Sequence, residues 1–201
     1  MKNLSVKSRL GAVLAAALAL SVPATVQAQT PVSSAKVVAA ITRGVNYLLS
    51  QCKAKTYWEQ NLIVPGKPEA TSQFLGETAL ITESLLDVGQ SLKLPQIDTS
   101  VQPMKGAINF LVTHDNKTTY ATSFQANVLA LLPQRRKYQA ILRWDARFLV
   151  HSMHTDGGYH YAWGTADYAK YFPNVPGDWD NSNTQYGVLG AWAVEHAGLS
   201  L

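Results

Sequence analysis

Apolar residues recur at the spacing of an α-helix in six separate segments of the chain. The segments cover residues 33–51, 72–88, 103–114, 120–132, 138–153 and 182–196. Within each segment, apolar residues stand three or four positions apart, which is the spacing that gives a helix one buried face. No stretch of useful length alternates between apolar and polar residues, as a half-buried strand would. The pattern therefore predicts an all-α protein.

The same pattern indicates which side chains we expect in the core and where the helices end. The expected core residues are Val37, Ile41, Val45, Leu48, Ile81, Leu85, Val88, Met104, Ala107, Ile108, Leu111, Phe124, Val128, Leu131, Ile141, Trp144, Phe148, Leu189, Trp192, Ala193 and His196. Gly89 is expected to stop the second helix and Pro133 the fourth. Ser182 and Gln185 form a Ser-x-x-Gln capping box, which predicts that the last helix begins there.

The six helices form three pairs with similar sequences. The first helix of each pair ends in an aromatic residue followed by two aliphatic ones, starting at Tyr47, Phe110 and Phe148. The second helix of each pair begins with hydroxyl and small residues, as at Thr78 and Thr184. Small residues let helices approach closely, so we expect the second helices to form an inner layer and the first helices an outer one. The alternative is a plain helical bundle whose similarities arise by chance.

The first 28 residues have the organisation of a secretory signal peptide. Three basic residues in the first nine positions precede an apolar run over 11–22, and Val26–Gln27–Ala28 fits a small-x-small cleavage site. The apolar run is shorter than the roughly 20 residues that span a bilayer. We therefore expect an exported protein, periplasmic or extracellular, whose residues 29–201 form one domain.

Removal of the signal peptide changes the charge of the chain. The mature part keeps 14 Lys and Arg against 13 Asp and Glu, so it is nearly neutral, and a nucleic-acid partner is not expected. No later segment is apolar for long enough to cross a membrane. The single cysteine, Cys52, leaves no internal disulfide, and we interpret it as a small, partly buried residue.

The last pair of helices resembles the repeat of the prenyltransferase and squalene-cyclase superfamily, whose fold is an α/α toroid. The resembling residues are Phe148–Leu149, Asp156–Gly157–Gly158–Tyr159 and 180–192, within a match that is good over 146–198 and weaker over 41–89 and 104–132. The resemblance implies an α/α toroid-type stack of about three hairpins, which is an incomplete ring. Such a stack exposes the apolar flank meant for the next hairpin. We therefore expect either a truncated gene product, which is favoured, or association with another copy or protein.

The resemblance also suggests an acid site. Class II terpene cyclases of this superfamily protonate an alkene with a carboxylic acid at a helix start, and Asp178 and Asp180 stand in that position. Asn181 replaces one acidic residue of the family pattern, which removes part of the acid network. The alternative is that Asp180 and Asn181 cap the last helix and suit its dipole.

The loop before the last helix supplies further candidates. The candidate ligand-binding residues, for an isoprenoid or a glycan, are Tyr159, Tyr161, Trp163, Trp179, Gln185 and Tyr186; the aromatic ones could equally serve as core residues. His151, His154 and His160 are weak candidates for metal ligands, and a polar hydrogen-bonded loop is the alternative. No cofactor is expected.

These observations favour an exported binding or scaffolding protein that is non-catalytic as this chain stands. A terpene-cyclase-like enzyme acting on an isoprenoid is one alternative. A glycan-active or glycan-binding toroid, such as a polysaccharide lyase, is the other.

Overall fold

The computed structural model describes residues 33–60, 73–114, 118–160 and 179–201. The chain divides into two compact units, 1–37 and 38–201, and only residues 33–37 of the first are described. The predicted signal peptide therefore lies outside the described residues, and the account below concerns the second unit.

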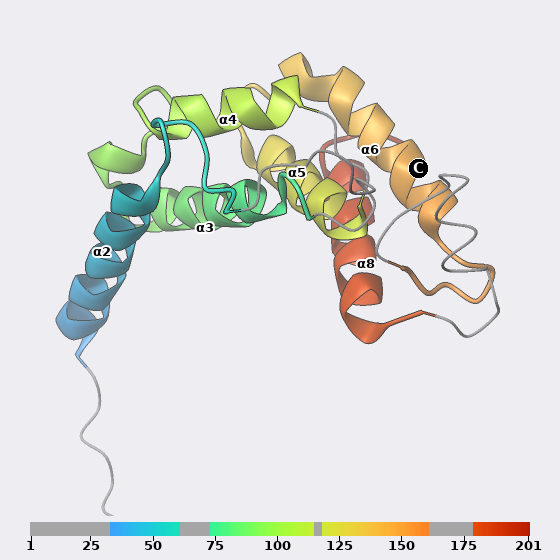
Figure 1. The fold of residues 1–201 in the computed structure, drawn as a ribbon, viewed down its shortest axis with the longest axis horizontal. Helices are drawn as coiled ribbons and strands as arrows, with labels where there is room; N and C mark the ends of the chain where they lie inside the picture. Colours follow the sequence, from blue (N-terminus) through green and yellow to red (C-terminus); the bar gives the residue numbers. More distant parts are fainter. Residues whose placement is uncertain (1–32, 61–72, 115–117, 161–178) are drawn as a thin grey trace, which may run out of the picture. The chain divides into compact units, whose positions relative to one another are not determined.

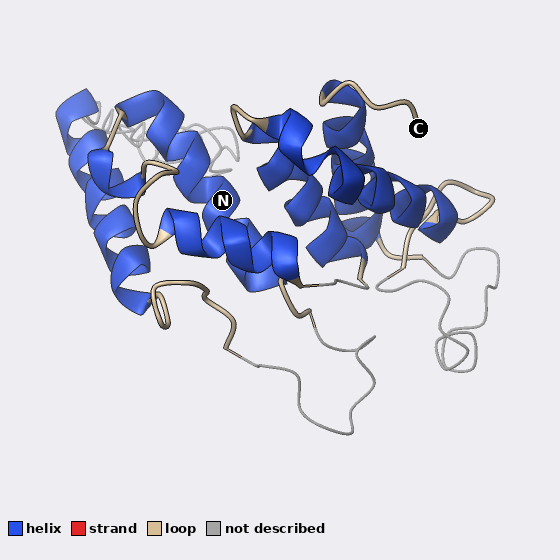
Figure 2. Ribbon diagram, turned by 90° about the horizontal axis from the view of Figure 1, so that it is seen from above, coloured by secondary structure: helices blue, strands red, loops and turns tan. Residues whose placement is uncertain are grey.

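Six α-helices make up most of the described residues, and no strand occurs among them (Figure 2). The helices are α2 (Ser34–Gln51), α3 (Gly76–Leu92), α4 (Met104–Thr113), α5 (Thr119–Leu131), α6 (Gln139–Ser152) and α8 (Asn181–His196). Short 3-10 helices cover Pro95–Ile97 and Arg135–Tyr138. The prediction of an all-α fold is confirmed. Within the described ranges, no helix combines the length and the apolar character that a membrane crossing requires.

The second helices of the three pairs lie side by side. Helix α5 contacts α3 on one side and α8 on the other, and the three helices follow one another in Figure 1. Helix α4 packs against α3, and α6 packs against α5 and α8. These contacts give the order of the second helices, whereas the inner and outer layers and closure into a toroid stay predictions.

Both ends of α3 and the N-cap of α8 differ from those expected. Helix α3 begins at Gly76 and not at residue 72, and it continues past Gly89 to Leu92. Its C-cap, Lys93, has a left-handed backbone (φ 53°), and the Lys93 N–H donates to the Gly89 carbonyl. A glycine is tolerated within a helix, so it did not act as the stop. Helix α8 begins at Asn181, and its N-cap is Asp180 and not Ser182, because the Asp180 carboxylate accepts the N–H of Asn183.

The core contains most of the expected residues, but six predicted positions are wrong. Val37, Ile41, Trp144, Leu189 and Trp192 are 45%, 36%, 43%, 41% and 57% exposed, and His196 is exposed too. On α2, Val45 is the residue that enters the core. The helical spacing was correct at these positions; within the described ranges, no neighbouring helix covers them.

The first and third pairs of helices share a set of hydrogen bonds. After α2, the N–H of Lys53 donates to the Tyr57 carbonyl (2.8 Å), and after α6 the N–H of His154 donates to the Gly158 carbonyl (2.8 Å). In both pairs, the residue that follows the accepting carbonyl then donates its own N–H to a threonine hydroxyl of the second helix. These bonds join Trp58 to Thr78 (3.0 Å) and Tyr159 to Thr184 (3.1 Å). The repeated bonds identify Trp58 and Tyr159, and likewise Thr78 and Thr184, as equivalent positions.

Candidate functional site

The start of α8 is held by Asp180. One carboxylate oxygen of Asp180 accepts the Asn183 N–H (2.7 Å) and the Ser182 hydroxyl (2.6 Å), and the other accepts the Asn183 amide (2.6 Å). Partial burial raises the pKa of Asp180, but the hydrogen bonds from Ser182 and Asn183 outweigh it, so the pKa lies below its ordinary value. Asp180 is therefore an ionised helix cap at neutral pH. The other candidate acid, Asp178, lies outside the described residues.

The glycine-rich loop before α8 is closed by an indole. Asp156 accepts the Gly158 N–H with one oxygen (3.2 Å) and the Trp179 indole N–H with the other (3.1 Å). The Trp179 ring lies against Gly158, where a Cβ atom would stand 2.3 Å from its Cγ. Trp179 therefore covers this loop, although the residue as a whole stays 42% exposed. Tyr161 and Trp163 lie outside the described residues.

The other candidate binding residues in the described ranges differ in their exposure. Tyr159 is 2% exposed, and its ring packs against Gly187, where a Cβ would lie 2.6 Å away. Tyr186 is half-buried, with its ring centroid 4.8 Å from those of Tyr120 and Phe124 on α5. Gln185 is exposed on α8. Tyr159 and Tyr186 thus pack between helices, which is the core role that the sequence offered as the alternative to ligand binding.

Two of the three candidate metal ligands lie together. The rings of His154 and His160 are both buried, and their centroids are 4.6 Å apart. His151 stands on the exposed side of α6. In the described part of the chain, no group of three or more His, Cys, Asp or Glu side chains is arranged to hold a metal ion.

Burial raises the pKa of the Cys52 thiol, which suits an unreactive, half-buried residue.

Helix α8 carries an exposed apolar face. Val188, Leu189 and Trp192 are 54%, 41% and 57% exposed and share one side of the helix. The Trp192 ring stacks on His196 with centroids 5.0 Å apart, which continues the face by one turn. Three large apolar side chains on one exposed face are typical of an interaction surface.

The caps show which residues of the three second helices correspond. Thr118 of α5 and Asp180 of α8 each accept the N–H three residues on, and the equivalent threonines align α3 with α8. In this alignment Gln185, Val188 and Trp192 of α8 match Ala79, Thr82 and Leu86 of α3, and Ser123, Ala126 and Ala130 of α5. Of these counterparts, Ala130 is half-buried and the others are buried. The exposed face of α8 therefore corresponds to positions that are buried or half-buried on α3 and α5. On α5 one of these positions, Ser123, lies against Gly190 of the following helix α8.

At the opposite edge, α3 also exposes residues whose counterparts on another second helix are covered. Leu80 of α3 is 46% exposed, and Ser84 and Asp87 on the same face are exposed too. Their counterparts on α8 are Tyr186, Gly190 and Ala193, which are buried or half-buried. Gly190 lies directly against α5, since a Cβ there would stand 2.7 Å from the Cα of Ser123.

Comparison of the chain with known proteins finds no matching family model, no similar curated protein and no similar solved structure.

Proposed function

We propose that this protein is an exported, non-catalytic scaffold of helical hairpins, and that a second copy of the chain docks on its α8 face. The proposal commits to a head-to-tail contact, in which the exposed edge of α3 in one copy covers α8 in another. The observation that carries it is the exposure of Val188, Leu189 and Trp192 at positions whose counterparts on α3 and α5 are buried or half-buried.

The contact between α5 and α8 supplies the geometry. Ser123 of α5 corresponds to Gln185 of α8, and Gly190 of α8 corresponds to Ser84 of α3. The close approach of Gly190 to Ser123 therefore predicts that Gln185 of one copy meets Ser84 of the next. Both residues are exposed in the single chain, so both are available for such a contact.

The expected strength follows from the area that is covered. Burying a large apolar side chain completely contributes roughly 1.5–3 kcal/mol, and Val188, Leu189 and Trp192 are already about half covered. Together they would contribute roughly 3 kcal/mol before the cost of association. We therefore expect a weak association that depends on concentration. Because the contact joins two different faces, it either closes into a ring or extends as a chain of copies.

The terpene-cyclase alternative is not favoured. Its acid must be protonated when it meets the alkene. Asp180 is instead ionised and engaged by Ser182 and Asn183. The glycan alternative was based in part on Tyr161 and Trp163, which lie outside the described residues.

Cysteine cross-linking tests the proposal. In a Cys52→Ser background, Gln185→Cys and Ser84→Cys are made separately and then mixed under mild oxidation. We expect disulfide-linked dimers in the mixture and far fewer from either variant alone. Ala140→Cys, an exposed position on α6 outside both edges, is the matched control for random collision. Efficient dimers from Gln185→Cys alone would indicate a symmetric α8–α8 contact and would refute the head-to-tail arrangement.

Sedimentation velocity provides the second measurement. The wild-type chain should form larger species as its concentration rises, and Trp192→Glu should keep it monomeric while leaving its helical circular dichroism unchanged. A wild-type chain that stays monomeric up to about 1 mM, where even a weak complex of about −4 kcal/mol would be half formed, overturns the proposal.

A further inference from the structure

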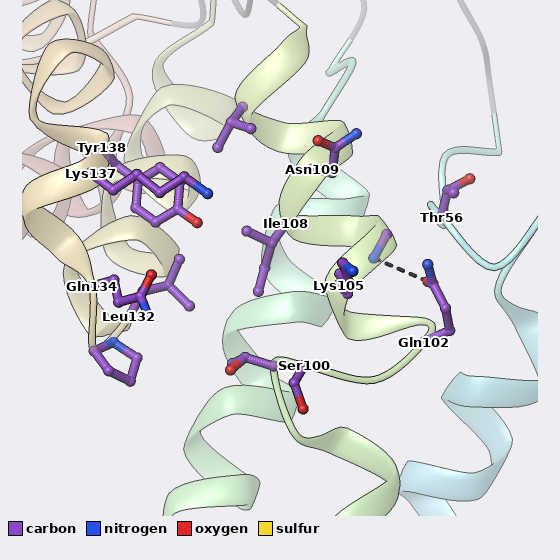
Figure 3. Close-up of a pocket in the computed structure, with 14 residues that line it drawn as sticks. Thr56, Ser100, Gln102, Lys105, Ile108, Asn109, Leu132, Gln134, Lys137 and Tyr138 are labelled. Carbon is purple, nitrogen blue, oxygen red and sulfur yellow. Dashed lines mark hydrogen bonds between the residues drawn. The ribbon is translucent and has the colours of Figure 1, made fainter.

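A cavity of about 570 Å³ lies between α4 and the segment that joins α5 to α6. Figure 3 shows Lys105, Ile108 and Asn109 of α4 on one wall, and Leu132, Gln134, Lys137 and Tyr138 on the other. The volume is within the range of roughly 300–1,000 Å³ that small-molecule sites occupy. None of its lining residues belongs to the α8 face, so this cavity is separate from the proposed docking surface.

The charges around the cavity are mostly positive. Lys105 and Lys137 line opposite walls, and no carboxylate is among the lining residues. Arg135 and Arg136 precede Lys137 in the same exposed 3-10 helix. A nearby carboxylate in sequence is Asp98, which is already engaged by the N–H and the hydroxyl of Ser100 (2.8 and 2.6 Å). A ligand in this cavity is therefore expected to carry negative charge.

The remaining polar groups suit hydroxyls. Gln102, Asn109 and Gln134 place carboxamides on the lining, and each carboxamide can both donate and accept a hydrogen bond. The Gly106 N–H donates to the Gln102 side-chain oxygen (3.1 Å), which holds that amide in place, as the dashed line in Figure 3 shows. Threonine and serine hydroxyls from Thr56, Thr99 and Ser100 add further partners.

Apolar side chains also line the cavity, and a close backbone contact supports the α4 wall. Ile108 and Leu132 are almost fully buried behind the lining, and the half-buried Tyr138 ring provides the flat contact on which the C–H face of a sugar ring can lie. The Lys137 ammonium is 5.4 Å from the centroid of the Tyr138 ring, which keeps that lysine beside the cavity. Gly106 lies so close to the Lys55 carbonyl that a Cβ would approach it to 2.3 Å, so the 55–56 turn lies directly on α4.

We propose that this cavity binds an anionic carbohydrate, with the acidic group held by Lys105 and Lys137 and the hydroxyls held by the carboxamides. A carboxylate of a uronic acid and a sulfate ester of a sugar present the same chemistry to two lysines. The experiment therefore has to compare these two sources with each other and with a neutral sugar.

Binding is measured on the full mature chain by ligand-observed NMR and calorimetry, with galacturonic acid, glucose-6-sulfate and neutral glucose as probes. An acidic sugar should bind with a Kd of roughly 1 mM, as expected for a few charge-assisted contacts, and at least about tenfold more tightly than glucose. The preference between carboxylate and sulfate identifies the natural acidic group. Equal binding of glucose, or no binding of any probe at about 10 mM, overturns the proposal.

Variants locate the site and separate it from unspecific charge. Lys105→Gln and Lys137→Gln should each weaken binding about fivefold or more, whereas Arg43→Gln, on the exposed surface of α2 and outside the lining, should have no effect. Asn109→Asp adds a negative charge at an exposed lining position without changing the size of the side chain, and it should abolish binding with the fold intact. Inorganic sulfate that binds as tightly as glucose-6-sulfate would show that no sugar is recognised and would refute the proposal.

Discussion

Asp145 should make the folded protein less stable as the pH rises. This residue is on α6, which packs against α5 and α8, and its side chain is fully buried. Neither of its carboxyl oxygens has a hydrogen-bond partner among the described residues. Burial therefore raises the pKa of Asp145 well above its ordinary value, since the charged form is the one that loses most from leaving water.

The pH dependence has a definite sign and slope. Below the ordinary pKa of an aspartate, the carboxyl is protonated in both the folded and the unfolded chain, and no titration penalty arises. Above that pKa, the unfolded chain releases the proton while the folded chain keeps it. The free energy of unfolding then falls by up to about 1.4 kcal/mol per pH unit, until the raised pKa of the folded state is reached.

Asp145→Asn isolates this effect, because the amide has nearly the same shape but does not titrate. At about pH 4 the variant and the wild type should be similarly stable. By about pH 7 the variant should be more stable by at least about 2 kcal/mol, since a buried polar group without partners costs about 1–3 kcal/mol and a charged one costs more. That gain is a large part of the roughly 5–15 kcal/mol that stabilises a typical domain.

Urea unfolding followed by circular dichroism at several pH values measures the difference directly. Glu195→Gln, which changes an exposed carboxylate on α8, is the matched control and should shift stability by less than about 0.5 kcal/mol at every pH. A constant difference between Asp145→Asn and the wild type from acid to neutral pH would refute the reasoning. It would mean that the Asp145 carboxylate is stabilised in the folded state.

Three further predictions concern the ionisation of Glu83, the Asp180 cap of α8 and the contact between Gly158 and Trp179. Burial, and secondarily the charge of Asp87, raise the pKa of Glu83 in the folded chain to about 7. The free energy of unfolding therefore falls as the pH rises from about 4 to 7. Glu83→Gln should then gain about 1 kcal/mol in urea unfolding at alkaline pH, after allowing for its partial exposure, and nothing in acid. Asp180→Ala should cost about 1 kcal/mol and Asp180→Asn almost nothing; equal losses would contradict the capping role. Gly158→Ala should displace Trp179, which near-ultraviolet circular dichroism would report as the same change seen in Trp179→Phe.

The helices could be predicted from the sequence because apolar residues recur in each one at helical spacing. Their ends were harder to predict, since Gly89 has the chemistry of a helix stop but is tolerated inside α3. The hydrogen bond from Trp58 to Thr78 joins residues 20 positions apart, so no local pattern predicts it. Lys105 and Lys137 likewise become neighbours of one cavity only through the fold.

The apolar residues of α8 show what hydrophobic periodicity does and does not encode. Their spacing predicts a buried face, and the matching positions on α3, Ala79 and Leu86, are buried. On α8 the spacing is equally regular, yet Trp192 is 57% exposed. Periodicity therefore specifies that a helix needs a neighbour, but not which polypeptide supplies it. Ser84, on the exposed edge of α3, corresponds to Gly190 of α8. Gly190 already packs against the neighbouring helix α5, so the α3 edge is the surface of this molecule whose counterpart makes such a contact.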